Sequence, residues 1–478
     1  MNDLSLPAGA AAADWTLARD SAGQVLLSGI DRSRVVDAAL NVAAGESVFG
    51  LLKGVADDDM ILPRLEPGQA PPFQSVLWRL ELASGRPLNG KDVLTRHWQR
   101  RPYAMTIRLV CYLPGSVTPE ILDEATIGTT GAWNEFRHSV DQMAMRLVRD
   151  AASGRSRGMS GNLPASPPSG APGWLGHTRR RWRDRSMNEW WSLGSSDTPI
   201  DDVLSGKMLR DIHWYSPEAG ERYFADPFPW FGTGMILCED MPRAGGVGRI
   251  VSVVPVGSRL SEPLISILDD GRHHSYPCTL PVGDAVYCVP EAPQRGGTQI
   301  CRLMQDGHLT PVAAIAPQAK LADPTLFRWH DKWWIACTDL DIGLHDNLCL
   351  LHAPAPEGPW RPHRKWPVKI DIRGARPAGT VFFHNGRLVR PAQDCAGSYG
   401  AGIALHGVTA LTETDFAETP ISVLRPDPDG PFPDGLHTLT HDGERFWVDG
   451  KRMVRDLGQA TRKLQKKLST YRYGRKGR

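Results

Sequence analysis

The chain has 478 residues, of which 41% are hydrophobic and 23% are charged, and its formal net charge at pH 7 is +2. These values are ordinary for a soluble globular protein, and the length predicts more than one domain. No apolar run reaches the roughly 18 residues of a transmembrane helix, and the first residues lack the basic start and apolar core of a secretory signal. We therefore expect a cytoplasmic protein without a membrane-spanning segment.

The first 150 residues mix helical and strand patterns. The short apolar segments Gln24–Ile30 and Met105–Leu113 are predicted to form two strands. Helical spacing over Ser33–Ala44 and Gly131–Arg149 predicts two helices. The region 1–150 is therefore predicted to be a small α+β domain, and it carries no catalytic motif.

Three segments without a repeat pattern flank the remaining domain. Residues 151–173 are rich in Gly, Ser and Pro and are predicted to form a linker. Residues 174–209 are basic and rich in Trp; we expect helices or an extended lead-in that docks on the next domain and supplies its closing strand. Residues 457–478 form a basic tail, with a short helix expected over 457–473.

The most basic stretches are His177–Arg185 and Arg462–Arg478. A solvated surface is one interpretation, and peripheral contact with an anionic membrane or a phosphate is the other. Neither stretch accompanies a nucleic-acid-binding motif, so no nucleic-acid partner is expected. The eight Cys show no CxxC spacing and most lie in apolar runs, which predicts small buried hydrophobic residues rather than a zinc site.

Residues 210–456 contain five similar segments, with starts about 50 residues apart. Each has a polar–Pro or equivalent step, an apolar strand, a turn of the GD, HD, HNG or HDG type, and a second apolar strand that ends near a carboxylate. The segments are Ala225–Asp240, Ser275–Ala292, Ala322–Asp339, Ala375–Asp394 and Gly435–Asp449. One four-stranded blade per repeat fits this period, so the fold class is predicted to be mainly β: a five-bladed β-propeller preceded by the small α+β domain. An irregular double sandwich is the alternative.

Equivalent positions of a propeller converge at its axis, which predicts one site built from all repeats. The residues at the repeat starts are Asp226, Tyr276, Asp323, Arg376 and His437. Further candidates for this site, near the strand ends and beside turns, are Glu239, Glu291, Asp394, Arg390, Trp230 and Tyr399. Two or three carboxylates around one pocket are the requirement of glycosidic chemistry.

Simpler interpretations of these residues stay open. An Asp-Pro step also caps strands in many proteins, although the repeated Ala-Asp-Pro at Asp226 and Asp323 favours a site. Glu291 precedes a Gly-rich turn and is equally compatible with a solvated position. Arg376 either grips a phosphate or pairs with a neighbouring Asp and holds the blades together.

The repeat motifs resemble those of the five-bladed propeller glycosidases, the family-43 glycoside hydrolases and their relatives. More specifically, YFADPF, LADPTLF, ARPAGTVFFHNGRLVRPAQD and GLHTL resemble the N-terminal propeller of the glucosamine inositolphosphorylceramide transferases, over about residues 190–456. Bacterial relatives of this module occur alone or fused to formyltransferase-like domains, so the α+β domain is expected to be a non-catalytic remnant of such a partner.

This resemblance implies that Asp226 is the catalytic base and that Asp323 tunes the pKa of the acid. The family-43 general acid is a Glu in the fourth blade, where this chain has Arg376, so Glu291 or Glu239 would supply a proton if one is needed. A phosphate leaving group needs none. We therefore expect glycosyl transfer from a sugar nucleotide or sugar phosphate in glycolipid or surface-polysaccharide synthesis, with Arg376 and His437 binding the donor.

A glycoside hydrolase that uses Asp226, Asp323 and Glu291 is the alternative function, and a non-catalytic carbohydrate-binding propeller is the third. The resemblance also allows an axial calcium, as some propeller glycosidases hold one, although no ligand set stands out in the sequence. No other cofactor is expected.

Overall fold

The computed structural model describes residues 15–19, 25–29, 77–86, 88, 91–100, 104–112, 118–129, 133–152, 155–158, 187–207, 209, 211–217, 222–242, 246–294 and 296–455. The helix predicted at 33–44, most of the linker, the basic stretch at 177–185 and the C-terminal tail lie outside these residues.

The described part of the first 158 residues combines antiparallel strands with two helices, as the α+β prediction requires, and is called the α/β unit below. Its elements are β1 Trp15–Arg19, β2 Val25–Gly29, β3 Leu77–Leu82, α3 Lys91–Arg100, β4 Ala104–Tyr112, β5 Glu120–Gly128 and α4 Trp133–Ala152. β1 and β2 form a hairpin, and the other three strands form a sheet in the order β3-β4-β5. Phe136, Val140 and Leu147 project from one face of α4 into a core shared with this sheet. The predicted strands and helix at 24–30, 105–113 and 131–149 correspond to β2, β4 and α4 and are confirmed.

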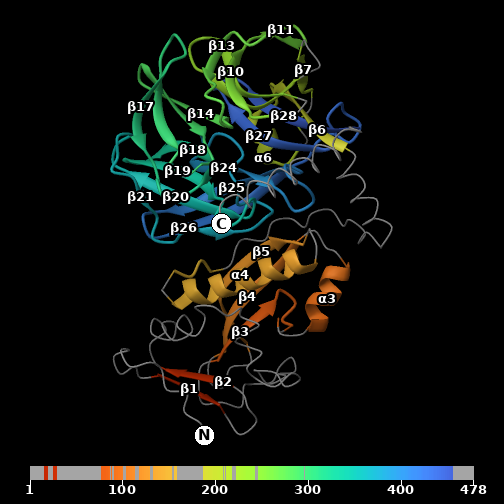
Figure 1. Cartoon of the computed structure of the whole chain (residues 1–478), viewed down its shortest axis with the longest axis vertical. Coiled ribbons are helices and arrows are strands. Elements are labelled where there is room, and N and C mark those ends of the chain that lie inside the picture. The colour runs from red at the N-terminus through yellow and green to blue at the C-terminus, as the bar shows by residue number, and fades with distance from the viewer. Residues whose placement is uncertain are drawn as a thin grey trace, which may run out of the picture.

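Five sheets follow, one for each sequence repeat (Figure 1), and their strand pairs are antiparallel except for β12 with β7 in the fifth. The first blade consists of β8 Arg222–Trp230, β9 Met235–Pro242, β10 Arg249–Val253 and β13 Ile265–Leu268. The second consists of β14 Ser275–Val282, β15 Ala285–Glu291, β16 Gln299–Leu303 and β17 Leu309–Ala314. The third consists of β18 Leu321–Trp329, β19 Lys332–Asp339, β20 Asn347–Ala353 and β21 Arg361–Pro362, with β22 Lys369–Ile370 also paired to β20. The fourth consists of β23 Phe382–His384, β24 Arg387–Asp394, β25 Gly402–Leu411 and β26 Phe416–Leu424.

The fifth blade combines strands that precede the other four blades in the sequence with strands that follow them. Its order is β27 Gly435–His441, β28 Phe446–Arg455, β6 Met187–Ser196 and β7 His213–Pro217, extended by β12 Arg259–Leu260 and β11 Pro255–Val256. The short helix α6 Ile200–Leu204 connects β6 to β7. β6 pairs with β28 along its whole length, so the lead-in supplies a closing strand, and the sheet array begins ahead of residue 210, where we predicted it to start. The reason is that β28 would otherwise present an open sheet edge.

The ring closes because neighbouring blades contact one another. β14 contacts β8 and β18, β24 contacts β27, and β27 contacts β8. Side chains of the third and fourth blades share an apolar cluster that contains Trp334 and Leu388. The fold is therefore mainly β, with the arrangement of a five-bladed propeller.

Apolar packing between the sheets accounts for most of the buried side chains. All eight cysteines are buried and free, as their positions in apolar runs predicted.

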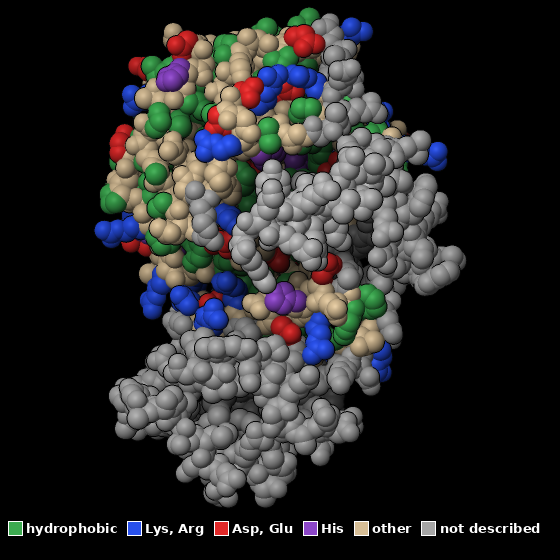
Figure 2. Space-filling model, in the orientation of Figure 1, with side chains coloured by type: hydrophobic (Ala, Val, Ile, Leu, Met, Phe, Trp, Pro, Cys, Tyr) green, Lys and Arg blue, Asp and Glu red, His purple; other side chains and the backbone are tan. Residues whose placement is uncertain are grey.

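Acidic and basic side chains are interspersed on the described part of one face (Figure 2). Among the described residues, no helix combines the length and apolar composition needed to cross a bilayer.

Candidate active site

The inner strands of four blades carry the same backbone irregularity. The register with the second strand shifts just where Asp226, Tyr276, Asp323 and His437 lie. The first three of these residues have positive φ angles of 54°, 46° and 49°. Such a conformation costs a non-glycine residue roughly 1–2 kcal/mol, and a bulge re-aims the side chain of the residue within it. The repeat therefore places these residues, by the same device, at one end of the axis.

We call Asp226, Tyr276, Asp323, Arg376 and His437 the axial ring. Carboxylates of adjoining blades accept backbone N–H groups of the axial ring. The amide of Asp226 donates to Asp449 over 3.0 Å, and the amide of Tyr276 donates to Asp226 over 3.3 Å. The amide of Asp323 donates to Glu291 over 2.8 Å. Buried amides need such partners, so each carboxylate stabilises the strained backbone of the next blade.

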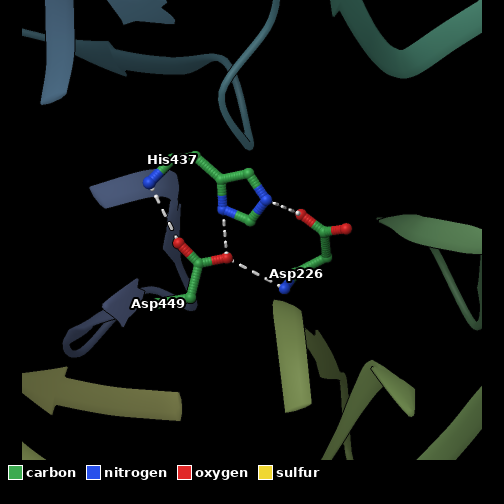
Figure 3. A group of neighbouring side chains, drawn as sticks. All are labelled: Asp226, His437 and Asp449. Carbon is green, nitrogen blue, oxygen red and sulfur yellow. Dashed lines mark hydrogen bonds and ion pairs between the residues drawn. The ribbon is translucent and has the colours of Figure 1, made fainter. Parts of the chain in front are cut away.

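His437 lies between two carboxylates (Figure 3). Its Nδ1 atom is 2.6 Å from Oδ2 of Asp449, and its Nε2 atom is 3.6 Å from Oδ1 of Asp226. Burial lowers the pKa of His437, but Asp449 and Asp226 outweigh burial and raise it to about 9. Burial raises the pKa of Asp226 to about 6, with His437 opposing the rise and Asp449 adding to it. His437 is therefore a cation at neutral pH, and Asp226 titrates close to neutrality.

Among the residues that the structure describes, these three form a group with the spacing of a metal-ligand set, because their ligand atoms lie within 4.8 Å of one another. They do not fit a metal. Asp449 accepts the backbone N–H of His437, Thr438 and Asp226 and also pairs with the His437 ring, which occupies the roughly four lone-pair sites of a carboxylate. Asp449 therefore has no acceptor site left for a cation, and the axial calcium that the resemblance allowed stays a prediction.

Arg376 pairs with Asp323 at the other side of the ring. Its Nε and Nη2 atoms both donate to the Asp323 carboxylate, the second over 3.2 Å. Its Nη1 atom donates to the carbonyl of Leu344 over 2.8 Å and lies 3.0 Å from Nδ1 of His345. Burial lowers the pKa of His345, and Arg376 lowers it further, to about 4, so the ring accepts rather than donates. A guanidinium has five N–H donors, so about one remains for a ligand.

Glu239 and Glu291 stand opposite Ala225 and Ser275 in the register of their blades. Burial raises the pKa of Glu239 well above its usual range, and Asp226 and Glu291 raise it further. Burial, with Asp323, raises the pKa of Glu291 to about 8. Burial therefore favours the protonated form of both side chains, in which a carboxyl donates a hydrogen bond and carries no charge, and Glu291 keeps this form at neutral pH.

Tyr276 lies in the ring as predicted, but it is fully buried. Its hydroxyl accepts the N–H of Gly379 over 2.6 Å and shares a 2.7 Å hydrogen bond with Thr325. Burial raises its pKa well above the usual range. Tyr276 thus joins the second, third and fourth blades beneath the ring.

The two aromatic side chains suggested as sugar platforms differ in position. Trp230 is 3% exposed and packs among apolar side chains of the first two blades, because it ends β8, beyond the central position that Asp226 occupies in this strand. Tyr399 is half-buried, and its ring lies 5.1 Å from the Arg376 guanidinium and 5.3 Å from the His437 ring. The structure thus places Tyr399 at the ring and Trp230 in the core.

Asp394 and Arg390 do not join the ring either. Asp394 pairs with Arg425 over 2.6 Å and accepts the N–H of Ala396. Arg390 is 2% exposed and donates to Glu418 and to two backbone carbonyls within the fourth blade. These partners neutralise the charges of Asp394 and Arg390, so both residues stabilise the fourth blade.

The sequence-based list missed Asp449, His345 and Gln393. Asp449 ends the fifth repeat as Glu239 ends the first, so the repeat pattern contained the signal for it. Gln393 donates to Asp323 over 2.8 Å, next to the residue that we had selected, Asp394. No sequence signal singles out His345, which lies in a loop between β19 and β20.

Comparison with known proteins identifies the repeats. Residues 250–429 match the family described as glucosamine inositolphosphorylceramide transferase 1, N-terminal. The glucosamine inositolphosphorylceramide transferase 1 of Oryza sativa subsp. indica is 28% identical over 161 residues, which are 33% of this chain and 22% of the relative. The protein of the same name from Arabidopsis thaliana is 27% identical over 165 residues, 34% of this chain and 22% of the relative. The match therefore spans about a fifth of these relatives.

Among solved structures, a thermostable family-43 glycoside hydrolase has a TM-score of 0.35 and 14% identity, over 52% of this chain and 89% of that one. An exo-β-1,3-galactanase from Clostridium thermocellum has a TM-score of 0.34 and 10% identity, over 44% and 54% of the two chains. The family match over residues 250–429 covers the second, third and fourth blades and confirms that they resemble the N-terminal module of the glucosamine inositolphosphorylceramide transferases.

Proposed function

We propose that the axial ring transfers a glycosyl unit from an activated, phosphate-bearing sugar donor to an acceptor hydroxyl, with Asp226 as the base or nucleophile. The charge state of the ring carries this proposal. Asp323 is neutralised by Arg376, and Asp449 is bound to the His437 cation. Asp226 is the ring carboxylate that has a pKa of about 6 and shares its cation with another acid.

A base with a pKa near the working pH is the most effective one, because it is ionised and still basic enough to accept a proton. Asp226 meets this requirement. Glu239 and Glu291 favour the neutral form, so they do not repel an anionic donor and can donate hydrogen bonds to it. The His437 cation and the remaining N–H of Arg376 add positive potential.

The names of the curated relatives support transfer and a lipid acceptor that carries inositol phosphate. We therefore place the reaction in the synthesis of a glycolipid or surface polysaccharide.

Hydrolysis of a neutral glycoside is the second candidate, and one observation favours it. The protonated Glu291 next to Asp323, and Glu239 next to Asp226, are pairs in which the environment separates an acid from a base. In such a hydrolase, Glu239 or Glu291 would protonate the leaving oxygen, in place of the fourth-blade Glu that is absent here.

Incubation of the purified chain with a panel of nucleoside-diphosphate sugars and of aryl glycosides, each with an inositolphosphoryl lipid as the acceptor, tests the proposal. Release of nucleoside diphosphate is the expected result. Release of the aryl group alone would contradict the proposal in favour of hydrolysis. Turnover of neither set, with retained sugar binding, would contradict it in favour of a carbohydrate-binding propeller.

A further inference from the structure

Three segments of the propeller surround Arg376. The loop Leu344–Asp346 provides the carbonyl and imidazole that contact its Nη1 atom. The turn Asp371–Ala375 leads directly into it, and the loop Cys395–Tyr399 places the Tyr399 ring beside its guanidinium. The position of the Arg376 side chain therefore depends on these segments.

The turn at Asp371 and Ile372 bonds all three segments together. The amide of Asp371 donates to the carbonyl of Asp346 over 2.7 Å, and the amide of Cys395 donates to the carbonyl of Ile372 over 2.9 Å. The amide of Ile372 donates over 2.9 Å to Thr126, which belongs to β5 of the α/β unit. The junction that supports Arg376 is thus also the point where the two parts of the chain meet.

Side chains on both sides of this junction strengthen the contact. Ile370 is fully buried in the core of the α/β unit, although it belongs to β22 of the propeller. Ile372, two residues on, packs with Cys395 and Ala396, and Ala104 at the start of β4 packs on this cluster together with Tyr399. One short segment therefore inserts one side chain into the α/β unit and another among the loops of the ring.

A buried group of one arginine and two aspartates lies at the same junction between the α/β unit and the propeller. Arg157 donates to Asp123 and Asp150 over 2.6 Å each, and its Nη1 atom also contacts the carbonyl of Pro367 over 3.5 Å. Further along, Arg146 of α4 lies close enough to Asp346 to oppose the rise in its pKa that burial causes. The α/β unit therefore contacts the turn at Ile372 directly and acts on the loop at Asp346 through the charge of Arg146.

We propose that the α/β unit is a positioning part of the active site, which holds Tyr399 and Arg376 in place through β5 and Ala104. We had expected this unit to be a remnant of a fused enzyme without a role in the site. Its effect on the order of the three segments follows from the contacts alone, whereas its effect on ligand affinity rests on the function proposed for the ring.

Substitution of Ala104 in the full-length chain tests this proposal. Ala104→Leu places a wedge between β4 and the loop at 395–399, while Ala104→Ser keeps the size of the side chain. Gln142→Ala, an exposed position on α4, is the matched control. Hydrogen–deuterium exchange is measured in the segments 344–346, 371–376 and 395–399 and in the hairpins of the first two blades, and pyrophosphate binding is measured by calorimetry.

We expect Ala104→Leu to speed exchange in the three segments at least fivefold and to weaken pyrophosphate binding about tenfold. The Ser and control variants are expected to behave like the parent, and the hairpins to be unaffected. Unchanged exchange in the three segments overturns the proposal. This holds even where Ala104→Leu detaches the whole α/β unit, because the segments would then keep their order without it. Faster exchange in a protein whose parent form does not bind pyrophosphate supports the positioning role and counts against the function proposed for the ring.

Discussion

The Nε2 atom of His437 lies 3.6 Å from Oδ1 of Asp226, and this contact joins the last blade of the propeller to the first at the axis. Thr438 adds a 2.6 Å hydrogen bond to the same carboxylate. Asp449 holds the other side of the imidazole, so the cation is fixed and Asp226 keeps a pKa near neutrality. The closure of the ring and its proposed chemistry thus depend on the same few side chains.

The pH dependence of turnover follows from Asp226 and Glu291. Asp226 must be ionised to act as a base, so kcat/KM is expected to rise as pH increases through about 6. Glu291 must be protonated to donate, so kcat/KM is expected to fall as pH increases through about 8. Initial rates with a nucleoside-diphosphate sugar between pH 5 and 9 check this bell shape, and a flat profile would count against these roles.

Glu291→Gln separates hydrogen bonding from proton transfer. The side-chain amide of Gln can still accept the backbone N–H of Asp323 and can still donate a hydrogen bond, but it cannot release a proton. If Glu291 only binds the donor phosphate, the variant retains activity within about tenfold and loses the alkaline limb of the profile. A loss of roughly 10²–10⁴-fold would instead identify a general acid and favour the hydrolase.

Stability is expected to fall between pH 6.5 and 9 because of His437. Its folded pKa is raised from 6.5 to about 9, so its contribution is fully present below pH 6.5 and is lost as pH rises through 9. The difference amounts to about 3 kcal/mol. Urea unfolding across this range is expected to show the slope in the parent and a flatter one in His437→Gln. Equal slopes in the two proteins would contradict the ion pair.

Removal of Arg376 is expected to be costly because it leaves Asp323 buried without a cation. Arg376→Met should lower the free energy of unfolding by roughly 3–5 kcal/mol. Arg376→Met combined with Asp323→Asn removes both charges and should recover a large part of that loss. Urea titrations of the single and double variants measure the coupling, and additive losses would show that the two charges act independently.

Tyr276→Phe tests the support beneath the ring. The variant keeps the buried aromatic ring but leaves the N–H of Gly379 without its acceptor. We expect a loss of about 1–3 kcal/mol in the free energy of unfolding. Thr325→Val removes the other partner of the hydroxyl and should cost less, since the contact to Gly379 remains.

Trp230→Ala distinguishes a core residue from a sugar platform. Because Trp230 is buried between two blades, the variant should lose about 3–5 kcal/mol of stability. Its affinity for sugar ligands, measured by calorimetry at a temperature where it is folded, should equal that of the parent. A weakened affinity without loss of stability would restore the stacking role.

The strands and the ring positions could be predicted because both depend on local signals. Turn residues and apolar runs mark each hairpin, and the repeat carries Asp226, Tyr276 and Asp323 to equivalent places. The closing role of β6 could only be suggested, since its partner β28 lies at the far end of the described chain. Strand pairing over such a separation leaves no local pattern.

The partners of the ring residues could not be predicted for a related reason. Neighbouring residues of a strand point to opposite faces, so an error of one position selects the wrong side chain. Gln393 contacts Asp323, whereas Asp394 turns away to Arg425. Likewise, the pairing of Arg376 with Asp323 depends on the juxtaposition of two blades, which the sequence left as one of two interpretations.

Turnover by Asp226→Asn tests the central claim most directly, because the amide keeps the shape of the side chain and removes its basicity. The parent, Asp226→Asn and the control Asp284→Asn, an exposed hairpin position, are compared with the best sugar-nucleotide donor found for the parent. We predict a loss of at least 10²-fold in kcat for Asp226→Asn and none for Asp284→Asn. Full activity in a folded Asp226→Asn protein would contradict the account.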